Sequence, residues 1–486
     1  MTVPLPDRVG PHGTRLAIVD PVGDWTFTDL DNHAARLAGA LEIGRGDRVG
    51  VLCTPGHDVV TAVLACWHAG ALAVPLHPPH PDAELAYVLA DSGATAIVAS
   101  TAHHAAATRL VATSGIRVVD VNADGPAERR SPALDDPALM VYTSGTTGRP
   151  KGVVHTHRSL AAMVDGMIDA WGWSATDRTV LVLPLNHVHG LVNVTVTALA
   201  VGACCEAPGG FDVTAVWERL RSGDVTVFMA VPTVYARLTA AWEAADGQTR
   251  ARWSDGAAGL RLMVSGSAAL PVSTLEQWRR LTGHTLLERY GMTELGMVLS
   301  NTLDRRVPGH VGEPMPGVEV RVVDDTGADA DEGQPGELLV RGSQMFVGYW
   351  ERPDATAEAF VDGWFRTGDV GIHEPDGYRL LGRSSVDIIK TGGEKVSALE
   401  IEEVYRTHPQ IADCAVVGLD DTEWGQRVAL AAVPAADAVP DGDGLRAWGK
   451  ERLAAAKVPT RFAVVEELPR NTLGKVVKPE VAKLFS

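Results

Sequence analysis

A loop rich in glycine, serine and threonine is the strongest candidate for binding phosphate groups. Residues 144–152 read SGTTGRPKG and follow the apolar run 138–142. Small residues let backbone N–H groups approach a polyphosphate, while hydroxyl groups and Lys151 add donors and positive charge. The loop lacks the Walker pattern, because Pro150 precedes the lysine and Gly152 follows it. A flexible turn would have a similar composition, so this loop alone does not decide the function.

Two more loops follow apolar runs that are typical of strands. Residues 265–271 read SGSAALP after the run 261–264, and residues 290–294 read YGMTE. Ligands of open α/β sheets bind at the carboxyl ends of strands, where both loops are expected. Glu294 in the second loop could hold a magnesium ion that bridges phosphates.

Four short motifs in the second half of the chain carry further polar and charged residues. They are WFRTGD at 364–369, Gly382-Arg383, KTGGEK at 390–395 and PRNTLGK at 469–475. Each alone could be an ordinary turn or a surface salt bridge. Together with the first three loops they form an ordered set over more than 300 residues, which excludes a chance combination.

The elements that must position these loops alternate between apolar strands and alanine-rich helices. Such alternation predicts an α/β fold, with parallel sheets covered by helices. The predicted strand and helix pairs are 48–52 with 59–69, 96–99 with 102–113, and 225–230 with 234–244.

The pattern changes twice along the chain, which predicts the domain organisation. After residue 312 short β-rich segments such as 318–323 and 336–340 lie between Gly, Pro and Asp turns. After residue 382 helices and strands return. We therefore predict an N-terminal domain over 1–382, with a β-rich subdomain at about 312–382, and a C-terminal domain over 383–486. The last domain is expected to contain helices at 398–405 and 445–455, a strand at 413–418 and a solvated loop at 434–444.

Composition excludes several classes of protein. The 486 residues include 45% hydrophobic and 21% charged residues and have a net charge of −18, which excludes a disordered or fibrous chain and argues against nucleic-acid or anionic-membrane partners. The five cysteines show no C-x-x-C spacing, so we expect buried thiols in a reducing compartment. The start of the chain lacks a signal-peptide pattern, and the run 191–205 is too short to span a bilayer. A cytoplasmic protein is predicted.

In this order and spacing, the motifs resemble the acyl-adenylate-forming superfamily of acyl-CoA synthetases, peptide-synthetase adenylation domains and luciferases. The resemblance extends from about Trp25 to Lys483. It implies a large N-terminal domain, a small mobile C-terminal domain and an active site between them. It also implies ATP, Mg²⁺ and coenzyme A as cofactors. A carboxylate would attack the α-phosphate of ATP to give an acyl adenylate and pyrophosphate, and a thiol would then displace AMP.

The resemblance also implies a role for individual residues. Lys475 would be the adenylation lysine, Thr293 would hydrogen-bond the α-phosphate, and Glu294 with Thr146 or Thr147 would hold magnesium. Asp369 would accept the ribose hydroxyls, Arg383 would contact the ribose or phosphate, and Ser267 and Ala268 would flank the adenine. The complete set of predicted nucleotide-binding residues is Thr143, Ser144, Gly145, Thr146, Thr147, Lys151, Gly266, Ser267, Ala268, Glu288, Arg289, Tyr290, Gly291, Met292, Thr293, Asp369, Arg383 and Lys475.

A second conformation of the C-terminal domain would serve the thiol. By resemblance, pantetheine would pass the loop of Lys390, Thr391, Gly392, Gly393 and Glu394. The hinge is expected within residues 385–387, where the chain is one residue longer than the usual pattern. Four other side chains could contact the CoA nucleotide or could equally be solvated: Arg158, Arg427, Lys478 and Trp424.

The acid substrate is predicted from two positions. Arg289 stands where members that take long or aromatic acids commonly have glycine; its guanidinium would shorten the pocket and bind a second carboxylate. Its alternative role is a salt bridge with Glu288 or another acid. His187 is assigned to the acyl pocket with His189 in reserve, although His187 could equally make a structural hydrogen bond. Ser265 completes the predicted substrate contacts.

Segments 183–191, 288–294 and 384–400 resemble malonyl-CoA synthetases. The predicted substrate is therefore malonate or a 2-substituted malonate such as methylmalonate. Three alternatives stay open: a synthetase for short or medium monocarboxylic acids, an adenylation enzyme that loads a carrier protein, and a non-catalytic scaffold. The expected partners are a small carboxylate, ATP and CoA, without nucleic acid or membrane, and the chain is expected to be a monomer or weak dimer.

Overall fold

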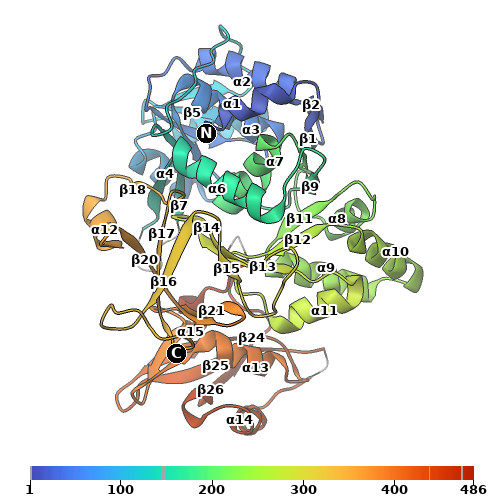
Figure 1. The fold of residues 1–486 in the computed structure, drawn as a ribbon, viewed down its shortest axis with the longest axis vertical. Coiled ribbons are helices and arrows are strands. Elements are labelled where there is room, and N and C mark those ends of the chain that lie inside the picture. Colours follow the sequence, from blue (N-terminus) through green and yellow to red (C-terminus); the bar gives the residue numbers. More distant parts are fainter. Residues whose placement is uncertain (1–2, 144–148, 437, 472–473, 486) are drawn as a thin grey trace.

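The apolar runs of the chain assemble into four β-sheets (Figure 1). The computed structural model describes residues 3–143, 149–436, 438–471 and 474–485. In Figure 1 the elements up to β21 (Gly377–Arg383) form the upper body, and the later elements form a lobe below it that contains the C-terminus. This arrangement confirms the predicted α/β class with a separate C-terminal lobe.

Two large sheets form the core of the upper body. The strands from β13 through β1 in the first sheet are parallel, as are those from β7 through β6 in the second, and the remaining pairs are antiparallel. The first sheet has the order β15 (Glu313–Pro314), β14 (Gly296–Ser300), β13 (Leu287–Met292), β12 (Leu262–Ser265), β11 (Val227–Ala230), β9 (Arg178–Val180), β10 (Cys204–Glu206), β1 (Leu16–Asp20) and β2 (Gly23–Thr26). The second has the order β18 (Gly348–Tyr349), β8 (Lys151–Thr156), β7 (Pro137–Thr143), β4 (Leu72–Pro75), β3 (Arg48–Leu52), β5 (Ala96–Ala99) and β6 (Arg117–Asp120).

Helices cover these sheets and share a large apolar core with them. Every residue of β11 and β12 is buried, which is typical of parallel strands with helices on both faces. The helices of the upper body are α1 (Pro6–Val9), α2 (Phe27–Leu41), α3 (His57–Ala69), α4 (Asp82–Asp91), α5 (His104–Leu110), α6 (His157–Trp171), the π-helix η3 (His189–Val196), α7 (Thr197–Ala200), α8 (Val213–Leu220), α9 (Pro232–Ala244), α10 (Gly247–Ala258), α11 (Val272–Thr282) and α12 (Pro353–Glu358).

The predicted β-rich segment forms the third sheet, which lies toward the C-terminal lobe (Figure 1). Its strands are β16 (Val318–Val323), β17 (Gly336–Gly342), β20 (Trp364–Glu374), β19 (Phe360–Val361) and β21 (Gly377–Arg383), with a separate apolar cluster beneath them. The expected boundary near residue 382 falls at the end of β21. The division into domains stays a prediction.

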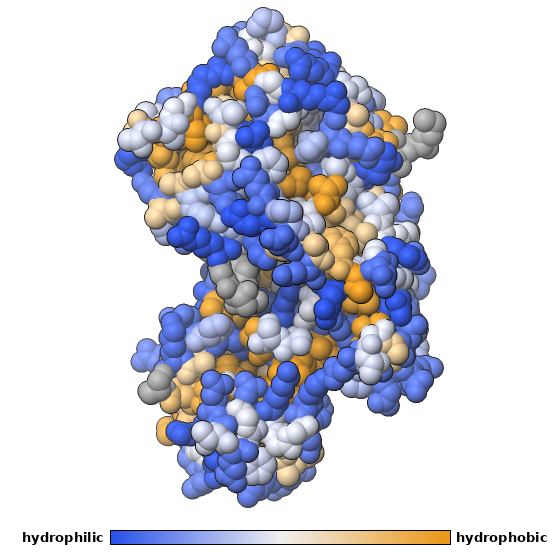
Figure 2. Space-filling view, turned by 90° about the vertical axis from the view of Figure 1, so that its left-hand side faces the viewer, coloured by the Kyte–Doolittle hydropathy of each residue, from blue (hydrophilic) through white to orange (hydrophobic). Residues whose placement is uncertain are grey.

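The C-terminal lobe contains the fourth sheet and two apolar clusters of its own. Its strands are β23 (Glu394–Ser397), β22 (Ile388–Thr391), β25 (Gly425–Pro434), β24 (Ile411–Asp421) and β26 (Arg461–Val464), and its helices are α13 (Ala398–Arg406), α14 (Gly442–Lys450) and α15 (Lys478–Lys483). Figure 2 shows a waist between this lobe and the upper body, with a mainly hydrophilic surface.

Several boundaries differ from those expected. The helix predicted over 102–113 is shorter, because a 3₁₀ turn occupies Thr101–His103 and the chain leaves the helix after Leu110. The helix predicted over 445–455 begins and ends earlier, since Asp441 caps Asp443 and Gly444 and starts the first turn at Gly442. The five cysteines are buried and unpaired, as expected. Over the described part of the chain, helices that combine the length and apolarity needed to cross a bilayer are absent.

Candidate active site

Asp369 is held between two side chains that fix the direction of its carboxylate. It lies on β20 opposite Arg383 of β21. The hydroxyl of Tyr290 donates to Oδ2 of Asp369 at 2.5 Å, and Nη1 of Arg383 lies 3.6 Å from Oδ1. Burial raises the pKa of Tyr290 well above its usual range, so the hydroxyl remains a donor. Arg383 also donates from Nη2 to the carbonyl of Thr367 at 2.9 Å.

Glu294 is buried and lies beside the ends of the glycine-rich loop. Tyr349 of β18 donates its hydroxyl to Oε1 of Glu294 at 2.9 Å, and Nζ of Lys151 lies 4.8 Å from the centre of the Tyr349 ring. Burial raises the pKa of Glu294, and a nearby cation would oppose this shift. Thr143 and Lys151 pair across β7 and β8. The predicted phosphate-binding residues between them, Ser144, Gly145, Thr146 and Thr147, lie outside the described residues.

The turn that carries Thr293 is anchored by a histidine that the sequence did not reveal. Nε2 of His155 on β8 lies 2.8 Å from the carbonyl oxygen of Thr293. Burial lowers the pKa of His155 to about 4, so the neutral ring donates this hydrogen bond at neutral pH. A lone histidine in a strand gives no pattern that would indicate this contact. Gly291 and Met292, also predicted site residues, pair with β14 through their backbones.

Arg289 is a buried cation whose hydrogen-bonding groups are only partly used. Its exposed fraction is 5%, and its Nε and Nη2 have no hydrogen-bond partner among the described residues. Burial lowers its pKa to about 9. A Cβ on Gly266 would lie 2.4 Å from Cζ of Arg289, so the guanidinium packs directly on glycine backbone. The neighbouring Ser265 Oγ is also buried without a partner in the described structure.

The alternative role of Arg289, a salt bridge with Glu288 or another acid, is not found among the described residues. Oε1 of Glu288 instead accepts a hydrogen bond from the Gly309 amide at 2.9 Å. Burial, with a smaller contribution from Glu403, raises the pKa of Glu288 to about 8. Adjacent residues of a strand point to opposite faces, so Glu288 cannot neutralise its neighbour.

His189 lies beside Ser267 and Arg289, whereas His187 lies beside His77 and His80. Nδ1 of His189 lies 2.9 Å from Oγ of Ser267, and its Nε2 is buried without a partner in the described part of the chain. Burial and then Arg289 lower the pKa of His189, so the ring is neutral. Burial and then His77 and His80 lower the pKa of His187 to about 4. The role of His187 stays a prediction, and His189 is the histidine beside Arg289.

Ser267 has a φ of +68°, which is uncommon for a residue other than glycine. The sharp turn that it makes directs its hydroxyl to His189. Ala268, the other residue predicted to flank the adenine, is half-buried in the same turn. The conformation of Ser267 therefore joins the predicted adenine side of the site to the predicted acyl side.

The C-terminal lobe brings the Lys475 hairpin against the upper body. Lys475 is exposed, and its carbonyl accepts a hydrogen bond from the Asn471 amide at 2.9 Å. A Cβ on Gly474 would lie 2.4 Å from Oγ1 of Thr233 at the start of α9. The lobes are therefore in direct contact beside Lys475.

The predicted CoA loop is the hairpin of β22 and β23. Gly392 and Gly393 have φ values of +58° and +85°, which favour glycine. Trp424 packs over Gly392, and Lys395 Nζ lies 2.8 Å from Oδ1 of Asp325 in the upper body. Lys390, Thr391 and Glu394 complete the hairpin, with Lys390 paired to Lys395 and Thr391 to Glu394.

Three of the four side chains considered for the CoA nucleotide are engaged elsewhere. Arg158 forms a surface pair with Asp135, Arg427 pairs with Asp421, and Lys478 is buried beside Glu402. Trp424 alone among the four is exposed beside the predicted CoA loop.

Comparison with known proteins assigns the family. A model described as AMP-binding enzyme matches residues 5–350, and one described as AMP-binding enzyme C-terminal domain matches residues 400–475. The chain belongs to the AMP-binding enzyme family. This confirms the resemblance that the motifs indicated.

Relatives of this AMP-binding enzyme match it over nearly its whole length. The mitochondrial malonate–CoA ligase of Mus musculus is 42% identical, with 99% of this chain and 90% of that protein covered. Among solved structures, ATP-bound MatB from Rhodopseudomonas palustris has a TM-score of 0.92 at 31% identity, with 99% of both chains covered. A malonyl-CoA ligase product complex with methylmalonyl-CoA and AMP has a TM-score of 0.72 at 38% identity, with 96% of this chain and 100% of that one covered.

Proposed function

We propose that the chain is an AMP-forming malonate–CoA ligase. Malonate and ATP would give malonyl adenylate and pyrophosphate, and the thiol of CoA would then displace AMP to give the thioester. The buried, partly unpartnered guanidinium of Arg289 is the observation that carries this proposal. The curated relatives named malonate–CoA ligase support it.

The chemistry of Arg289 favours an acid with a second carboxylate. A buried cation without a partner is costly, and a planar carboxylate can satisfy two parallel N–H donors at once. Nε and Nη2 are the two groups that lack partners among the described residues. His189 and Ser265 would offer further polar contacts beside the same carboxylate. A monocarboxylic acid would leave the guanidinium buried and unpaired.

The nucleotide side would act mainly through positioning and charge. Asp369, already oriented by Tyr290, would accept the ribose hydroxyls through its two oxygens. Lys475 would reach the α-phosphate from the C-terminal lobe and stabilise the charge that develops there. AMP is a better leaving group than oxide, which is why the acid must be adenylated before a thiol can displace it.

The residues around Glu294 fit a magnesium ion. A carboxylate together with substrate phosphates is the usual ligand set for Mg²⁺, and the buried Glu294 provides such an oxygen beside Lys151 and Tyr349. Thr146 is the second proposed ligand. When bound, the ion would neutralise part of the phosphate charge.

The C-terminal lobe would rotate relative to the upper body between the two half-reactions. Lys475 would have to leave before the thiol could approach the adenylate, and the loop of Lys390 to Glu394 would take its place. The TM-scores support this proposal: the relative with the higher identity, solved with methylmalonyl-CoA and AMP, fits less well than the ATP-bound relative. The present arrangement would then serve adenylation. The hinge within residues 385–387 remains part of the proposal.

Methylmalonate is proposed as a second substrate, because the product complex named above contains methylmalonyl-CoA.

The five buried cysteines are compatible with a reducing compartment such as the cytoplasm, although several relatives are named as mitochondrial. A monomer or weak dimer is proposed. A feruloyl-CoA synthase is also 33% identical to this chain, but Arg289 and the malonate–CoA ligase relatives favour malonate over a monocarboxylic acid.

The decisive test is ATP-dependent thioester formation with malonate, methylmalonate, acetate and butyrate. Arg289→Ala should lower kcat/KM for malonate by about 100-fold or more, because it removes a charge-assisted bidentate contact. The rate with butyrate should change far less. Arg305→Ala, which removes an exposed arginine paired with Asp376, is the control. Unchanged selectivity in Arg289→Ala would reject the second-carboxylate role, and holo-carrier protein accepted in place of CoA would favour the carrier-loading alternative.

A further inference from the structure

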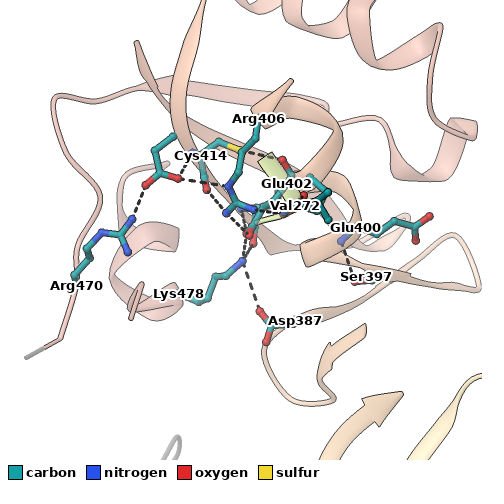
Figure 3. Close-up of polar contacts among 12 residues, drawn as sticks. Val272, Asp387, Ser397, Glu400, Glu402, Arg406, Cys414, Arg470 and Lys478 are labelled. Carbon is teal, nitrogen blue, oxygen red and sulfur yellow. Dashed lines mark hydrogen bonds and ion pairs between the residues drawn. The ribbon is translucent and has the colours of Figure 1, made fainter. Parts of the chain in front are cut away.

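A buried group of charged residues lies inside the C-terminal lobe (Figure 3). Nζ of Lys478 contacts Oε1 of Glu402 and donates to the carbonyl of Val416 at 2.6 Å. The other carboxylate oxygen of Glu402 accepts from Nη2 of Arg406 at 3.0 Å. Glu402 has an exposed fraction of 3%. Burial opposes its ionisation, but Lys478 and Arg406 outweigh this effect and lower its pKa.

This group anchors both arms of the hairpin that carries Lys475. On the preceding arm, Arg470 pairs with Asp413, whose Oδ1 lies 3.6 Å from Nε of Arg406. Arg470 also donates to the carbonyl of Gly474 at 2.6 Å. On the following arm, Lys478 begins α15 three residues after Lys475. Figure 3 shows Arg470 and Lys478 approaching the group from two sides.

The same group reaches the proposed hinge. Oδ1 of Asp387 lies 3.6 Å from Nζ of Lys478, and its Oδ2 accepts from the Arg383 amide at 3.0 Å. The Asp387 amide donates to the Arg383 carbonyl at 2.7 Å. A Cβ on Gly382 would lie 2.4 Å from Cβ of Asp387. The chain before the lobe, the lobe interior and the Lys475 hairpin are thus connected through backbone hydrogen bonds at Asp387 and through ion pairs inside the lobe.

We propose that Glu402 and Lys478 are positioning residues that fix Lys475 for adenylation. The inference rests on the proposed role of Lys475. Neither side chain touches the predicted substrates. They act by holding the following arm of the hairpin at fixed points of α13 and β24, while Arg470 and Asp413 hold the preceding arm. Ion pairs with additional backbone hydrogen bonds suit this task, because their geometry is more directional than apolar packing. The CoA loop lies on another hairpin, so we expect the thioester step to depend far less on this alignment than adenylation does, although Lys478 also contacts Asp387 at the proposed hinge.

The test separates the two half-reactions. Lys478→Met removes the charge and keeps most of the side-chain volume, and Lys478→Arg keeps the charge. Adenylation, measured as malonate-dependent pyrophosphate exchange, should fall about 10- to 100-fold in Lys478→Met and recover largely in Lys478→Arg. Thioester formation from supplied malonyl adenylate should change by less than about twofold. Lys483→Met, which removes an exposed lysine of the same helix paired with Glu480, should leave both steps unchanged.

A second variant keeps the test decisive if Lys478→Met does not fold. Arg470→Met changes a partly exposed side chain, with an exposed fraction of 34%, and should show the same selective loss of adenylation. Equal slowing of both half-reactions, or no effect on either, would overturn the positioning role. Lys475→Ala is measured in parallel: if it does not impair adenylation, the proposed role of Lys475 itself is wrong, whatever the other variants do.

Discussion

Burial affects the neighbouring charges of Glu288 and Arg289 in opposite ways. It raises the pKa of the carboxyl to about 8 and lowers that of the guanidinium to about 9. Both shifts favour the uncharged form, as expected for groups removed from water. Glu288 has a backbone amide from Gly309 as its partner, whereas two groups of Arg289 lack one among the described residues. At the residue scale, Arg289 is therefore the residue to which a ligand could add the missing hydrogen-bond acceptors.

Gly266→Ala tests whether the position of that guanidinium matters. The added Cβ would lie 2.4 Å from Nε and Cζ of Arg289. Because the atoms it meets form the end of a flexible side chain, we expect the protein to fold and the guanidinium to move. The KM for malonate should rise about tenfold or more while the KM for ATP changes little. Steady-state kinetics with each substrate varied would measure both.

Gly247→Ala is the matched control, since a Cβ there has open space around it. It should leave both KM values unchanged. An unchanged KM for malonate in a folded Gly266→Ala protein would contradict the proposed carboxylate contact of Arg289.

The raised pKa of Glu288 leads us to predict that the stability of the fold depends on pH. Its pKa is raised from 4.5 to about 8, so the folded protein retains a proton that the unfolded chain has lost between these values. Stability should therefore fall as pH rises from about 4.5 through about 8, because the folded protein binds the proton that the unfolded chain releases over this range. Glu288→Gln should flatten this decline and raise the unfolding temperature at pH 8. Thermal unfolding at several pH values would measure it.

The control for this prediction is Glu276→Gln, an exposed carboxylate of α11. It should keep the original decline with pH. If Glu288→Gln also kept it, another buried acid would be responsible, and Glu403, whose pKa burial also raises, would be the next residue to change.

Sequence reasoning proposed which residue types could form the site, but it could not give their environments. The choice between His187 and His189 depends on local conformation, because residues two apart share a face of a strand but diverge in a helix. The segment becomes a π-helix at His189, and the motif alone does not indicate that conformation. Similarly, burial of Arg289 away from Glu288 depends on which face of β13 meets Gly266.

At the scale of elements, four side chains fix β7 and β8, the two strands on either side of the glycine-rich loop. We call this group, Tyr87, Asp91, Tyr142 and Arg352, the Asp91 clamp. Asp91, at the end of α4, accepts from Tyr142 at 2.8 Å and from Arg352 at 2.7 Å. The Tyr87 hydroxyl donates to the carbonyl of Pro150 at 2.8 Å and lies 3.3 Å from Oδ1 of Asp91. The Asp91 carboxylate thus connects α4 to β7 and to Arg352, which follows β18. Tyr87, also on α4, adds a contact to Pro150, which precedes β8.

Asp91→Ala should loosen this clamp and weaken ATP binding. The KM for ATP should rise about three- to tenfold, because the ends of the proposed phosphate loop lose their fixed separation, while the preference for malonate over butyrate stays the same. Asp82→Ala at the other end of α4 removes only an exposed pair with Arg109 and serves as control. Equal effects of the two variants on the KM for ATP would contradict the clamp.

Most long elements were predicted because their hydrophobic periodicity extends over whole strands and helices. The strands β3, β5 and β16 match the expected residues, and α9 begins two residues before the expected start. Helix ends were less predictable, since they depend on single caps. Asp441 starts α14 three residues before the first apolar position. The four-sheet arrangement needs pairings between distant strands, such as β1 with β10, which local patterns do not contain.

At the scale of the whole molecule, an acidic protein is proposed to bind three anionic ligands. The net charge of −18 opposes ATP, CoA and malonate in the long-range field. Attraction must therefore come from a few local cations whose effect is short-ranged in salt. Arg289 is buried, Arg383 is oriented by Asp369, Lys151 lies over Tyr349, and Lys475 is exposed on the C-terminal lobe.

Movement of the C-terminal lobe can be tested by a reversible crosslink. A Cβ on Gly474 would lie 3.1 Å from Cβ of Thr233, and disulfides need about 3.5–4.5 Å. A bond in Thr233→Cys/Gly474→Cys therefore needs a small displacement and a side chain at a position whose φ of +75° favours glycine. The five native cysteines are buried and should not compete. The oxidised protein should keep pyrophosphate exchange and lose thioester formation, because the lobe can no longer bring the loop of residues 390–394 to the adenylate.

Reduction should restore the second step, and both single variants should be insensitive to oxidation. Equal thioester formation before and after reduction, with the crosslink verified by mass, would contradict alternation of the lobes.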